Sequence, residues 1–583
     1  MTDTAAAEAL FRDLNRRFDR LDVLVNNAGS GSMNAIALTP VDVAPFGVTC
    51  NAVGPCPIRT KLTASVPVAK IQALIDRRRG VLSAARERDG DRTGHLSGRS
   101  GVILDCVLDR MAGGGAAPAL AVGDTVYTYR ELVDRVAYWS GRLRDRTIFG
   151  RVVSIEGEYG FETVAAFLAA ARFRNVIMPL SDASAAHHEK FLEIGEVEYR
   201  IRPSGGDDAI SWTGCAASHD FYARLRRAEV PGLVLFSSGS TGRQKAAVHD
   251  LDALLKKFLT RRHCYRTLVF LQLDHIGGIN TLFYTLANGG MVVVADGRMP
   301  RDVCRAVAQH GVELLPTSPT FLNLLLLSEE HTRHDLSSLK LITYGTEPML
   351  EITLARVRAA FPEANLLQTY GLSELGILRS QSREAGSLWM RGGDEGFETK
   401  IVDGRLFIRA RSAMLGYLNA PSPFAAEGFF DTGDLVEVDG DWIRIIGRHT
   451  EVINVGGNKV FPMEVENPLL ALDNVDDVAV HGESNPFTGQ VVVASVTLSR
   501  EEDLASFKTR MRLFCRDRLA AYKIPAKVLL VRTLHSARFK KIRRAMPVPA
   551  LIMPHFDHSM LPGMRGRRGR AVASAPPLMG STR

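Results

Sequence analysis

Between residues 152 and 368 the sequence alternates short apolar runs with longer segments of helical character, and this alternation limits the fold more than any other feature. Short runs rich in Val, Ile and Leu are typical of buried strands. A strand, a helix and a second strand in succession normally form a parallel pair, so the pattern predicts a layered α/β domain with mainly parallel sheets. The expected strands are 152–155, 175–180, 233–236, 267–273, 291–295, 313–315, 339–343 and 365–368, and the expected helices are 162–173, 301–310, 321–327 and 352–361.

The apolar run 233–236 leads into a loop of hydroxyl groups and glycines, Ser-Ser-Gly-Ser-Thr-Gly at 237–242, with Lys245 just beyond it. Glycines let backbone N–H groups approach an anion closely, serine and threonine add donors, and lysine adds a cation. The loop does not match the GxxxxGK[ST] pattern. Taken alone, the stretch is either a phosphate-binding loop or a polar turn that follows a core strand.

Length and composition indicate an ordinary soluble, multidomain protein. The 583 residues are 46% hydrophobic and 23% charged, which allows three or four domains at roughly 150 residues each. No apolar run approaches the roughly 20 residues of a membrane helix, and the N-terminus lacks an apolar signal core, so we expect a cytoplasmic protein without a membrane span. The seven cysteines are scattered and form no CxxC pair, which indicates neither a disulfide framework nor a zinc site.

The net charge of +8 is concentrated at the C-terminal end. Residues 538–583 contain ten Lys or Arg and one acid, so this end carries +9 and the rest of the chain carries about −1. The body of the chain therefore gives no reason to expect specific binding of nucleic acid. We expect residues 547–583 to form a disordered basic tail, although a basic run of this kind could also contact RNA or anionic lipid.

Two N-terminal stretches resemble the short-chain dehydrogenase/reductase family: LDVLVNNAG at 21–29 and VTCNAVGPCPIRTKL at 48–62. The glycine-rich dinucleotide turn of that family has no room upstream, and its Tyr-x-x-x-Lys pair is absent because the first tyrosine of the chain is Tyr127. Hydride transfer in that family needs both features. The resemblance therefore implies a partial, Rossmann-like remnant over residues 1–76, followed by a linker over 77–100.

A second resemblance covers roughly residues 101–546. Seven segments occur in the order typical of the adenylate-forming superfamily, which includes acyl-CoA synthetases, adenylation domains and luciferases. The order of seven segments is far more specific than any one of them. The segments are SSGSTGRQK (237–245), LDHIGG (273–278), YGTEPM (344–349), TYGLSE (369–374), FFDTGDL (429–435), IIGR (445–448) and VGGNKVFPMEVE (455–466).

This resemblance implies a large multi-layer domain over 101–447 and a small, mobile α+β domain over 448–546. It also implies an ATP-dependent acid–thiol ligase. A fatty or aryl acid would be activated to an acyl-adenylate and transferred to coenzyme A, with release of AMP and pyrophosphate. The implied cofactors are ATP, Mg²⁺ and coenzyme A. Two anions must meet in this reaction, so the site has to neutralise charge that develops in the transition state.

The resemblance assigns roles to individual residues. Glu374 would bind Mg²⁺, which prefers oxygen ligands, and Thr369 would bond the α-phosphate. His275 would line and gate the acyl pocket, and Lys541 would bridge the carboxylate and the α-phosphate. The remaining nucleotide- and thiol-binding positions are Ser237, Ser238, Gly239, Ser240, Thr241, Gly242 and Lys245 on the phosphates, Gly345, Thr346, Glu347 and Tyr370 around adenine, Asp434 and Arg448 on the ribose, and Gly456 and Gly457 beside the thiol.

Several positions depart from the family pattern. His535 and Lys540 replace a proline and a glycine of the lysine motif, and Thr450 replaces an Asp or Lys at the hinge. Gln244 and Ala246 flank Lys245 where the family often has proline and glycine. These changes keep open a second hypothesis, a nucleotide-binding pseudoenzyme without turnover.

The residue after His275 bears on the substrate. Amino-acid-activating relatives place an aspartate there to pair with an ammonium group, whereas this chain has Ile276. A buried ammonium without a counter-ion would cost several kcal/mol, so an uncharged acyl or aryl group is expected. No carrier segment is visible in the chain, and the acceptor is either coenzyme A or a separate acyl carrier protein. An oxidoreductase is the third alternative, disfavoured by the missing tyrosine.

Overall fold

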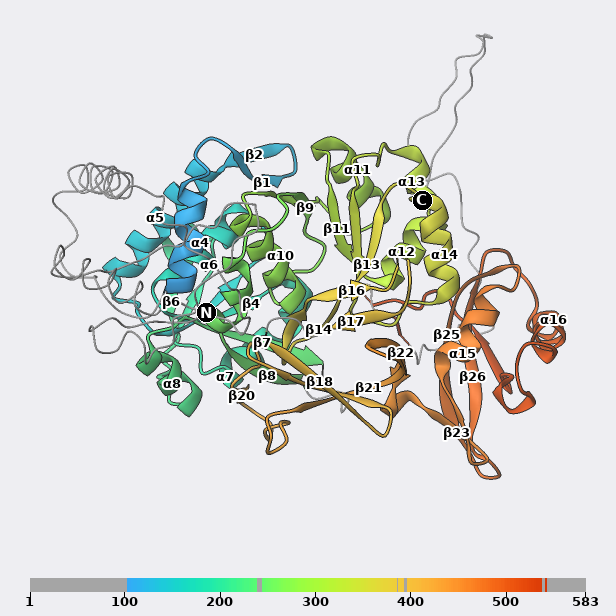
Figure 1. Cartoon of the computed structure of the whole chain (residues 1–583). Helices are drawn as coiled ribbons and strands as arrows, with labels where there is room; N and C mark the ends of the chain where they lie inside the picture. The colour runs from blue at the N-terminus through green and yellow to red at the C-terminus, as the bar shows by residue number, and fades with distance from the viewer. Residues whose placement is uncertain (1–101, 239–243, 385, 393–395, 537–540, 543–583) are drawn as a thin grey trace, which may run out of the picture. The chain divides into compact units, whose positions relative to one another are not determined.

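The computed structural model describes residues 102–238, 244–384, 386–392, 396–536, 541 and 542, all within the compact unit Arg99–Arg583 (Figure 1). The dehydrogenase-like stretch, the linker and the basic tail lie outside these residues and stay predictions. No helix of the described residues is long and apolar enough to cross a membrane.

One mixed sheet carries the hydroxyl-rich loop. Its four central strands are parallel, and β4 is buried along its whole length, as expected for a strand covered on both faces. The alanine-rich helix α6 (Phe161–Arg172) packs near α5 (Tyr129–Asp145), which begins with a capping box of Thr128 and Glu131. In spatial order the strands are β20 (Gly416–Tyr417), β8 (Gln244–Asp250), β7 (Gly232–Ser238), β4 (Val176–Leu180), β3 (Val152–Glu156), β5 (Tyr199–Ile201) and β6 (Ile210–Trp212).

A second sheet is parallel except for its edge strand β2. Its helices include α11 (Pro300–His310), which starts with a proline and stops at Gly311 in a left-handed conformation. The others are α12 (Pro319–Leu327) and α14 (Glu351–Ala360). In spatial order the strands are β13 (Asn365–Gln368), β12 (Leu341–Tyr344), β11 (Leu314–Thr317), β9 (Arg266–Leu268), β10 (Met291–Val294), β1 (Pro118–Val122) and β2 (Thr125–Thr128).

The prediction of a strand over 267–273 is wrong in length, because β9 ends at Leu268. One further ladder bond follows, from the Val269 N–H to the Val293 carbonyl. The chain then turns into α10 (Ile276–Ala287). A Cβ at Gly278 would lie 1.9 Å from the Gln272 carbonyl oxygen, so the helix start packs directly on this backbone and prevents a longer strand.

A six-stranded antiparallel sheet covers residues 380–448 and was not expected from the sequence. Along β21, buried and half-buried residues alternate, which indicates a strand with one covered face. Figure 1 shows β18, β21 and β22 below β11 and β13 of the second sheet in this view. In spatial order the strands are β16 (Ser380–Ser382), β17 (Met390–Gly392), β22 (Trp442–Arg448), β21 (Phe430–Asp439), β19 (Arg405–Ala410) and β18 (Phe397–Val402).

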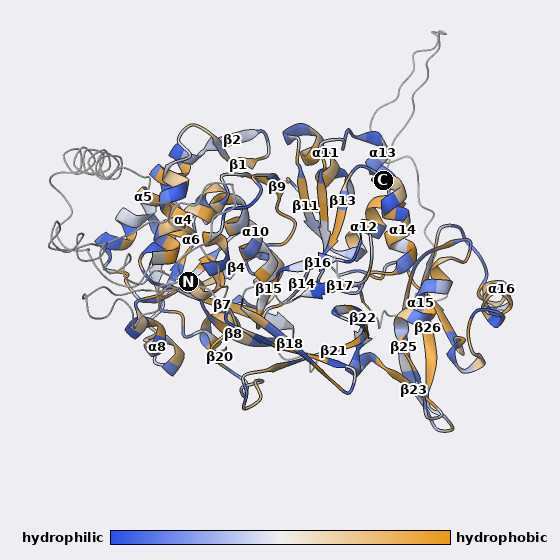
Figure 2. Ribbon diagram, viewed as in Figure 1, coloured by the Kyte–Doolittle hydropathy of each residue, from blue (hydrophilic) through white to orange (hydrophobic). Residues whose placement is uncertain are grey.

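The smaller C-terminal part is α+β, as expected. Its apolar core lies between the sheet and the helices α15 (Pro462–Leu470) and α16 (Leu504–Arg516). Figure 2 shows β26 as strongly hydrophobic, like β11 and β13 of the second seven-stranded sheet. The strands are β24 (Asn458–Val460), β23 (Ile453–Val455), β26 (Gly489–Leu498), β25 (Val475–Asn485) and β27 (Lys527–Leu530), the last pairing with β26.

Candidate functional site

The hydroxyl-rich stretch begins at the end of strand β7 and precedes its partner strand β8 in the sequence. Strands β7 and β8 are antiparallel, and Ser237 lies opposite Lys245. Asn419 braces the hairpin, because its Nδ2 donates to the Gln244 carbonyl at 2.9 Å and its Oδ1 accepts from the Ala246 N–H at 3.0 Å. The structure thus places Ser237, Ser238 and Lys245 at the base of the loop. Gly239, Ser240, Thr241 and Gly242 lie outside the described residues.

Glu374 is linked to this hairpin through Tyr417. It lies in the turn between β14 (Tyr370–Leu372) and β15 (Gly376–Leu378), and its carbonyl accepts from the Met414 N–H at 2.8 Å. The Tyr417 hydroxyl donates to Glu374 Oε1 at 2.7 Å, and Lys245 Nζ lies 5.1 Å from the centre of the Tyr417 ring, within cation–π range. Burial, together with the Glu374 charge, raises the pKa of Tyr417. A cation and a carboxylate therefore lie together at the mouth of the loop.

The sequence reasoning did not single out Tyr417 or Asn419. Both belong to the short β20 region, which pairs with β8. Their only sequence signal is the pattern Gly-Tyr-Leu-Asn after a Met-Leu pair.

Thr369 and Gly345 bring two strand ends together. The Thr369 N–H and Oγ1 both donate to the Tyr344 carbonyl, at 2.8 and 3.2 Å. A Cβ at Gly345 would lie 2.6 Å from Thr369 Oγ1, so only glycine permits this approach. Thr346 has φ +71°, which is strained for a β-branched residue.

Asp434 is the centre of a buried polar cluster. The Tyr370 hydroxyl donates to its Oδ2 at 2.5 Å and Arg448 Nε donates to its Oδ1 at 3.1 Å. The Asp434 residue is only 5% exposed. Burial raises its pKa, while Arg448 acts in the opposite direction. Burial, then the Asp434 charge, raises the pKa of Tyr370 well above its usual value. The structure thus brings together three of the predicted nucleotide residues.

His275 is the N-cap of α10. Its Nδ1 accepts from the Gly277 N–H at 3.0 Å, so a neutral ring carries its proton on Nε2. The preceding Asp274 accepts at Oδ2 from the Ser181 hydroxyl at 2.7 Å. The ring therefore has a structural contact at one nitrogen, at the start of α10.

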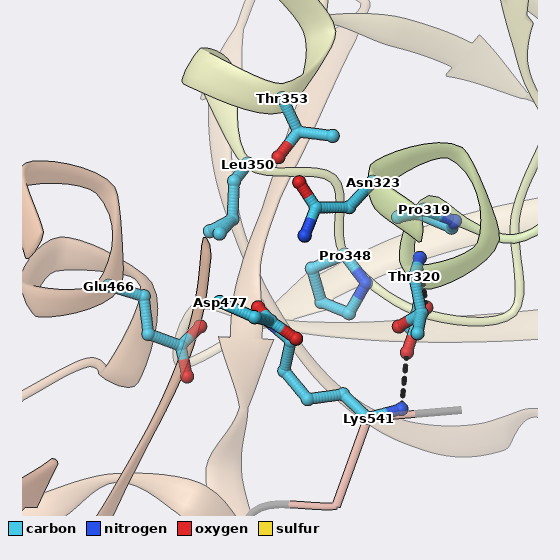
Figure 3. Close-up of a pocket in the computed structure, with 10 residues that line it drawn as sticks. Pro319, Thr320, Asn323, Pro348, Leu350, Thr353, Glu466, Asp477 and Lys541 are labelled. Carbon is cyan, nitrogen blue, oxygen red and sulfur yellow. Dashed lines mark hydrogen bonds and ion pairs between the residues drawn. The ribbon is translucent and has the colours of Figure 1, made fainter. Parts of the chain in front are cut away.

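Lys541 and Glu347 meet in space although 194 positions separate them in sequence. The Lys541 backbone N–H donates to Glu347 Oε2 at 3.0 Å, and the Thr320 N–H donates to Glu347 Oε1 at 2.7 Å. Lys541 Nζ lies 3.1 Å from Asp477 Oδ1 and donates to the Val478 carbonyl at 2.9 Å. Figure 3 shows Lys541, Asp477 and Thr320 beside a pocket. Glu347 thus uses its carboxylate to join the predicted adenine segment to the lysine motif.

Gly456 and Gly457 form the turn between β23 and β24, with φ of +57° and +86°. The Gly456 N–H donates to the Thr488 carbonyl at 2.8 Å. A Cβ at either glycine would meet nothing within 4 Å. The backbone conformation, rather than close packing within the chain, accounts for both glycines.

The side chains described above can be compared with what the expected ligands, ATP and Mg²⁺, require. Among the described residues, no group of three or more His, Cys, Asp or Glu could hold a metal ion. Magnesium commonly binds through one or two carboxylates together with phosphate oxygens and water. Glu374, which Tyr417 links to Lys245, is a carboxylate of the kind that such a site requires. The buried Asp434 carboxylate, fixed by two donors, fits the hydroxyl groups of a ribose.

Lys257 is a partly buried amine that the sequence did not single out. Its Nζ donates to Asn280 Oδ1 on α10 at 2.6 Å and to the Ile377 carbonyl on β15 at 3.0 Å. Both partners are neutral oxygens. Burial, with Arg262 nearby, lowers the pKa of Lys257 to about 7. Lys257 thereby connects the helix of His275 to the strand that follows Glu374.

The low pKa of Lys257 predicts a pH dependence of stability. Between pH 7 and about 10 the unfolded chain binds one more proton than the native chain, so the free energy of unfolding should rise with pH by up to ~1.4 kcal/mol per unit. Lys257→Met should lose this rise, whereas Lys256→Met, at an exposed position, should retain it. Urea unfolding from pH 7 to 9.5 measures the slopes, and equal slopes in wild type and Lys257→Met would contradict the assignment.

Comparison with known proteins identifies the family. The model of the "AMP-binding enzyme" family matches residues 109–418, and that of the "AMP-binding enzyme C-terminal domain" matches 464–541. Indoleacetate–CoA ligase of Aromatoleum aromaticum is 29% identical over 54% of this chain and 66% of its own length. Feruloyl-CoA synthase of an Amycolatopsis species is 26% identical over 71% of this chain and 91% of its own length.

Solved structures show the same fold. Anthranilate CoA ligase AuaEII, in complex with anthranoyl-AMP, has a TM-score of 0.64 at 20% identity and covers 76% of this chain and 95% of its own. ATP-bound MatB from Rhodopseudomonas palustris has a TM-score of 0.60 at 22% identity, with 73% and 95% covered. Several curated relatives are matched over only 61–66% of their length. Since the first family model alone spans more than half of the chain, the chain belongs to the AMP-binding enzyme family, the adenylate-forming superfamily.

Proposed function

We propose that this chain is an ATP-dependent acid–thiol ligase, which converts a carboxylic acid to an acyl-adenylate and then to a coenzyme A thioester. The observation that carries the proposal is the group of Lys245, Tyr417 and Glu374 at the mouth of the hydroxyl-rich loop. A triphosphate with Mg²⁺ needs a cation and a carboxylate at one place, and this group supplies both. Family membership supports the same reading.

The proposed steps use the residues as follows. Lys245 and the loop would hold the β- and γ-phosphates, and Glu374 would supply a carboxylate oxygen for Mg²⁺, which would neutralise phosphate charge. Asp434 and Arg448 bind the ribose, while Thr369 donates to the α-phosphate. Lys541 then neutralises the carboxylate and the α-phosphate as the new anhydride bond forms and pyrophosphate leaves. The C-terminal domain over 448–546 turns to admit the thiol, which displaces AMP.

An aryl acid is the proposed substrate class. Ile276 offers no carboxylate for a substrate ammonium, which favours an uncharged acyl or aryl group. The names of two relatives, indoleacetate–CoA ligase and feruloyl-CoA synthase, point to aromatic acids. Coenzyme A is the proposed acceptor. A free-standing acyl carrier protein is the second candidate.

A substrate panel tests the proposal. The full chain is incubated with ATP, Mg²⁺, coenzyme A and a set of aryl and fatty acids, and AMP, pyrophosphate and thioester are measured. We expect AMP and thioester to appear in equal amounts with at least one acid. Binding of ATP without AMP release across the panel would favour the pseudoenzyme. In a parallel incubation with NADPH, oxidation of NADPH would favour the oxidoreductase.

Tyr417→Phe tests the link to Glu374. The change removes one hydrogen bond to this carboxylate, worth about 1 kcal/mol, but keeps the ring that packs beside Lys245. We expect the Mg²⁺ concentration for half-maximal AMP formation to rise about fivefold, with little change in melting temperature. Tyr138→Phe, at a 45% exposed tyrosine outside the site, is the matched control. An unchanged Mg²⁺ requirement in Tyr417→Phe would argue against Glu374 as the metal ligand.

A further inference from the structure

The ammonium group of Lys541 is held by a carboxylate of the C-terminal sheet. Lys541 Nζ lies 3.1 Å from Asp477 Oδ1 and 2.9 Å from the Val478 carbonyl oxygen, and both partners belong to β25. The side chains of Lys541 and Asp477 are each 15% exposed. A pair shielded to this degree is screened less by salt than a surface pair. Asp477 therefore competes for the charge that Lys541 would bring to the reaction.

The main chain of Lys541 is fixed independently of its side chain. Its N–H donates to Glu347, whose second oxygen accepts from the Thr320 N–H at the start of α12. Two further hydrogen bonds join the large domain to the C-terminal part of the chain. Asn323 Nδ2 on α12 donates to the Asp476 carbonyl on β25 at 3.1 Å, and the Glu351 N–H at the start of α14 donates to Asn467 Oδ1 on α15 at 3.0 Å. With its backbone fixed in this way, Lys541 can leave Asp477 by rotation of its side chain alone.

A pocket next to Lys541 gives that side chain room to move. Thr320, Asn323, Asp477 and Lys541 all line it (Figure 3). Thr320 and Asn323 are 4% and 6% exposed, and Thr320 Oγ1 and Asn323 Oδ1 have no hydrogen-bond partner among the described residues. Buried oxygens of this kind are favourable acceptors for an ammonium group. The pocket thus offers Lys541 other partners once it leaves Asp477.

We propose that Asp477 is a positioning residue for Lys541: it holds the ammonium on β25 until the carboxylate substrate and the α-phosphate displace it. The single positive charge of Lys541 cannot neutralise Asp477, the carboxylate substrate and the α-phosphate equally well. Because Asp477 competes for this charge, it raises the substrate concentration that adenylation requires. The identity of the competing anions rests on the proposed function. The ion pair between Lys541 and Asp477 is observed directly and does not depend on the proposed function.

Chemical labelling tests the pair without any need for turnover. The full chain is treated with a trace of acetic anhydride, and acetylation of each lysine is measured by mass spectrometry. Asp477→Asn keeps the shape of the side chain but removes its charge, and should increase labelling of Lys541 at least threefold. Asp473→Asn, at an exposed aspartate paired with Arg500, should leave it unchanged. Equal labelling of Lys541 in wild type and Asp477→Asn would overturn the proposal.

Kinetics of the two half-reactions then test the consequence. In Asp477→Asn the KM for ATP in ATP–pyrophosphate exchange should fall threefold to tenfold, while conversion of preformed acyl-adenylate to thioester stays the same. Adding Asp477→Asn to Lys541→Ala should have no further effect, because Asp477 acts through Lys541. An unchanged or higher KM, or equal losses in both half-reactions with a lower melting temperature, would reject the positioning role. If no acid supports exchange, the proposed function fails, and labelling still decides the ion pair.

Discussion

Replacement of Lys541 by alanine is expected to lower ATP–pyrophosphate exchange by about 10²- to 10³-fold. Removal of one preorganised group that stabilises developing charge has effects of this size. Lys541 is proposed to serve adenylation alone, so a preformed acyl-adenylate should still react with coenzyme A at the wild-type rate. Rapid mixing of the variant with synthetic acyl-adenylate and coenzyme A measures that second step.

Lys527→Ala is the matched control for Lys541→Ala in the same part of the chain. Lys527→Ala removes a half-exposed lysine that pairs with Glu483 on β25, and should leave both half-reactions unchanged. The Lys541 backbone bond to Glu347 does not depend on its side chain and should remain in Lys541→Ala, whereas loss of the shielded pair with Asp477 should lower the melting temperature. Exchange at the wild-type rate in Lys541→Ala would reject the assignment. No exchange in the wild-type chain with any acid, together with the substitutions at His535 and Lys540, would instead favour the pseudoenzyme.

Asp434→Ala is expected to weaken ATP binding by about 100-fold or more. The carboxylate is proposed to accept from the ribose, and it is also the partner of the Tyr370 hydroxyl and of Arg448. Its loss removes charged hydrogen bonds worth about 1.5–3 kcal/mol each and leaves the buried Tyr370 hydroxyl and the exposed Arg448 guanidinium without this partner. Because Tyr370 and Arg448 both depend on Asp434, a moderate loss of stability should accompany the loss of affinity.

Calorimetric titration with ATP measures this effect without any requirement for turnover. Asp439→Ala is the matched control, because Asp439 ends the same strand β21 and pairs with Arg383 at the surface. The control should bind ATP as tightly as wild type. Wild-type affinity in Asp434→Ala would show that the buried cluster is only structural and would remove the ribose contact from the proposal.

The parallel part of the fold could be predicted because its strands are buried on both faces. Strands such as β4 appear in the sequence as continuous apolar runs bounded by helices. The antiparallel sheet over 380–448 escaped this reasoning. Strand β18, Phe-Glu-Thr-Lys-Ile-Val, is half-buried to exposed along its length, so hydrophobicity does not mark it. The start of α10 on the Gln272 backbone, which shortened β9, depends on a close backbone approach at Gly278 that the pattern of apolar residues does not encode.

The sequence alone carried the resemblance to the family, through the order of seven segments, and it showed the residue types expected at each strand end, because apolar runs and the polar segments that follow them are local features. Family membership and the α/β fold are confirmed. Only the tertiary structure decided which side chains of the candidate site contact one another. It joined Tyr417 to Glu374, Tyr370 and Arg448 to Asp434, and Lys541 to Asp477 and Glu347. These contacts link residues between 14 and 194 positions apart, and a hydrogen bond or an ion pair depends on distance in space rather than on distance along the chain.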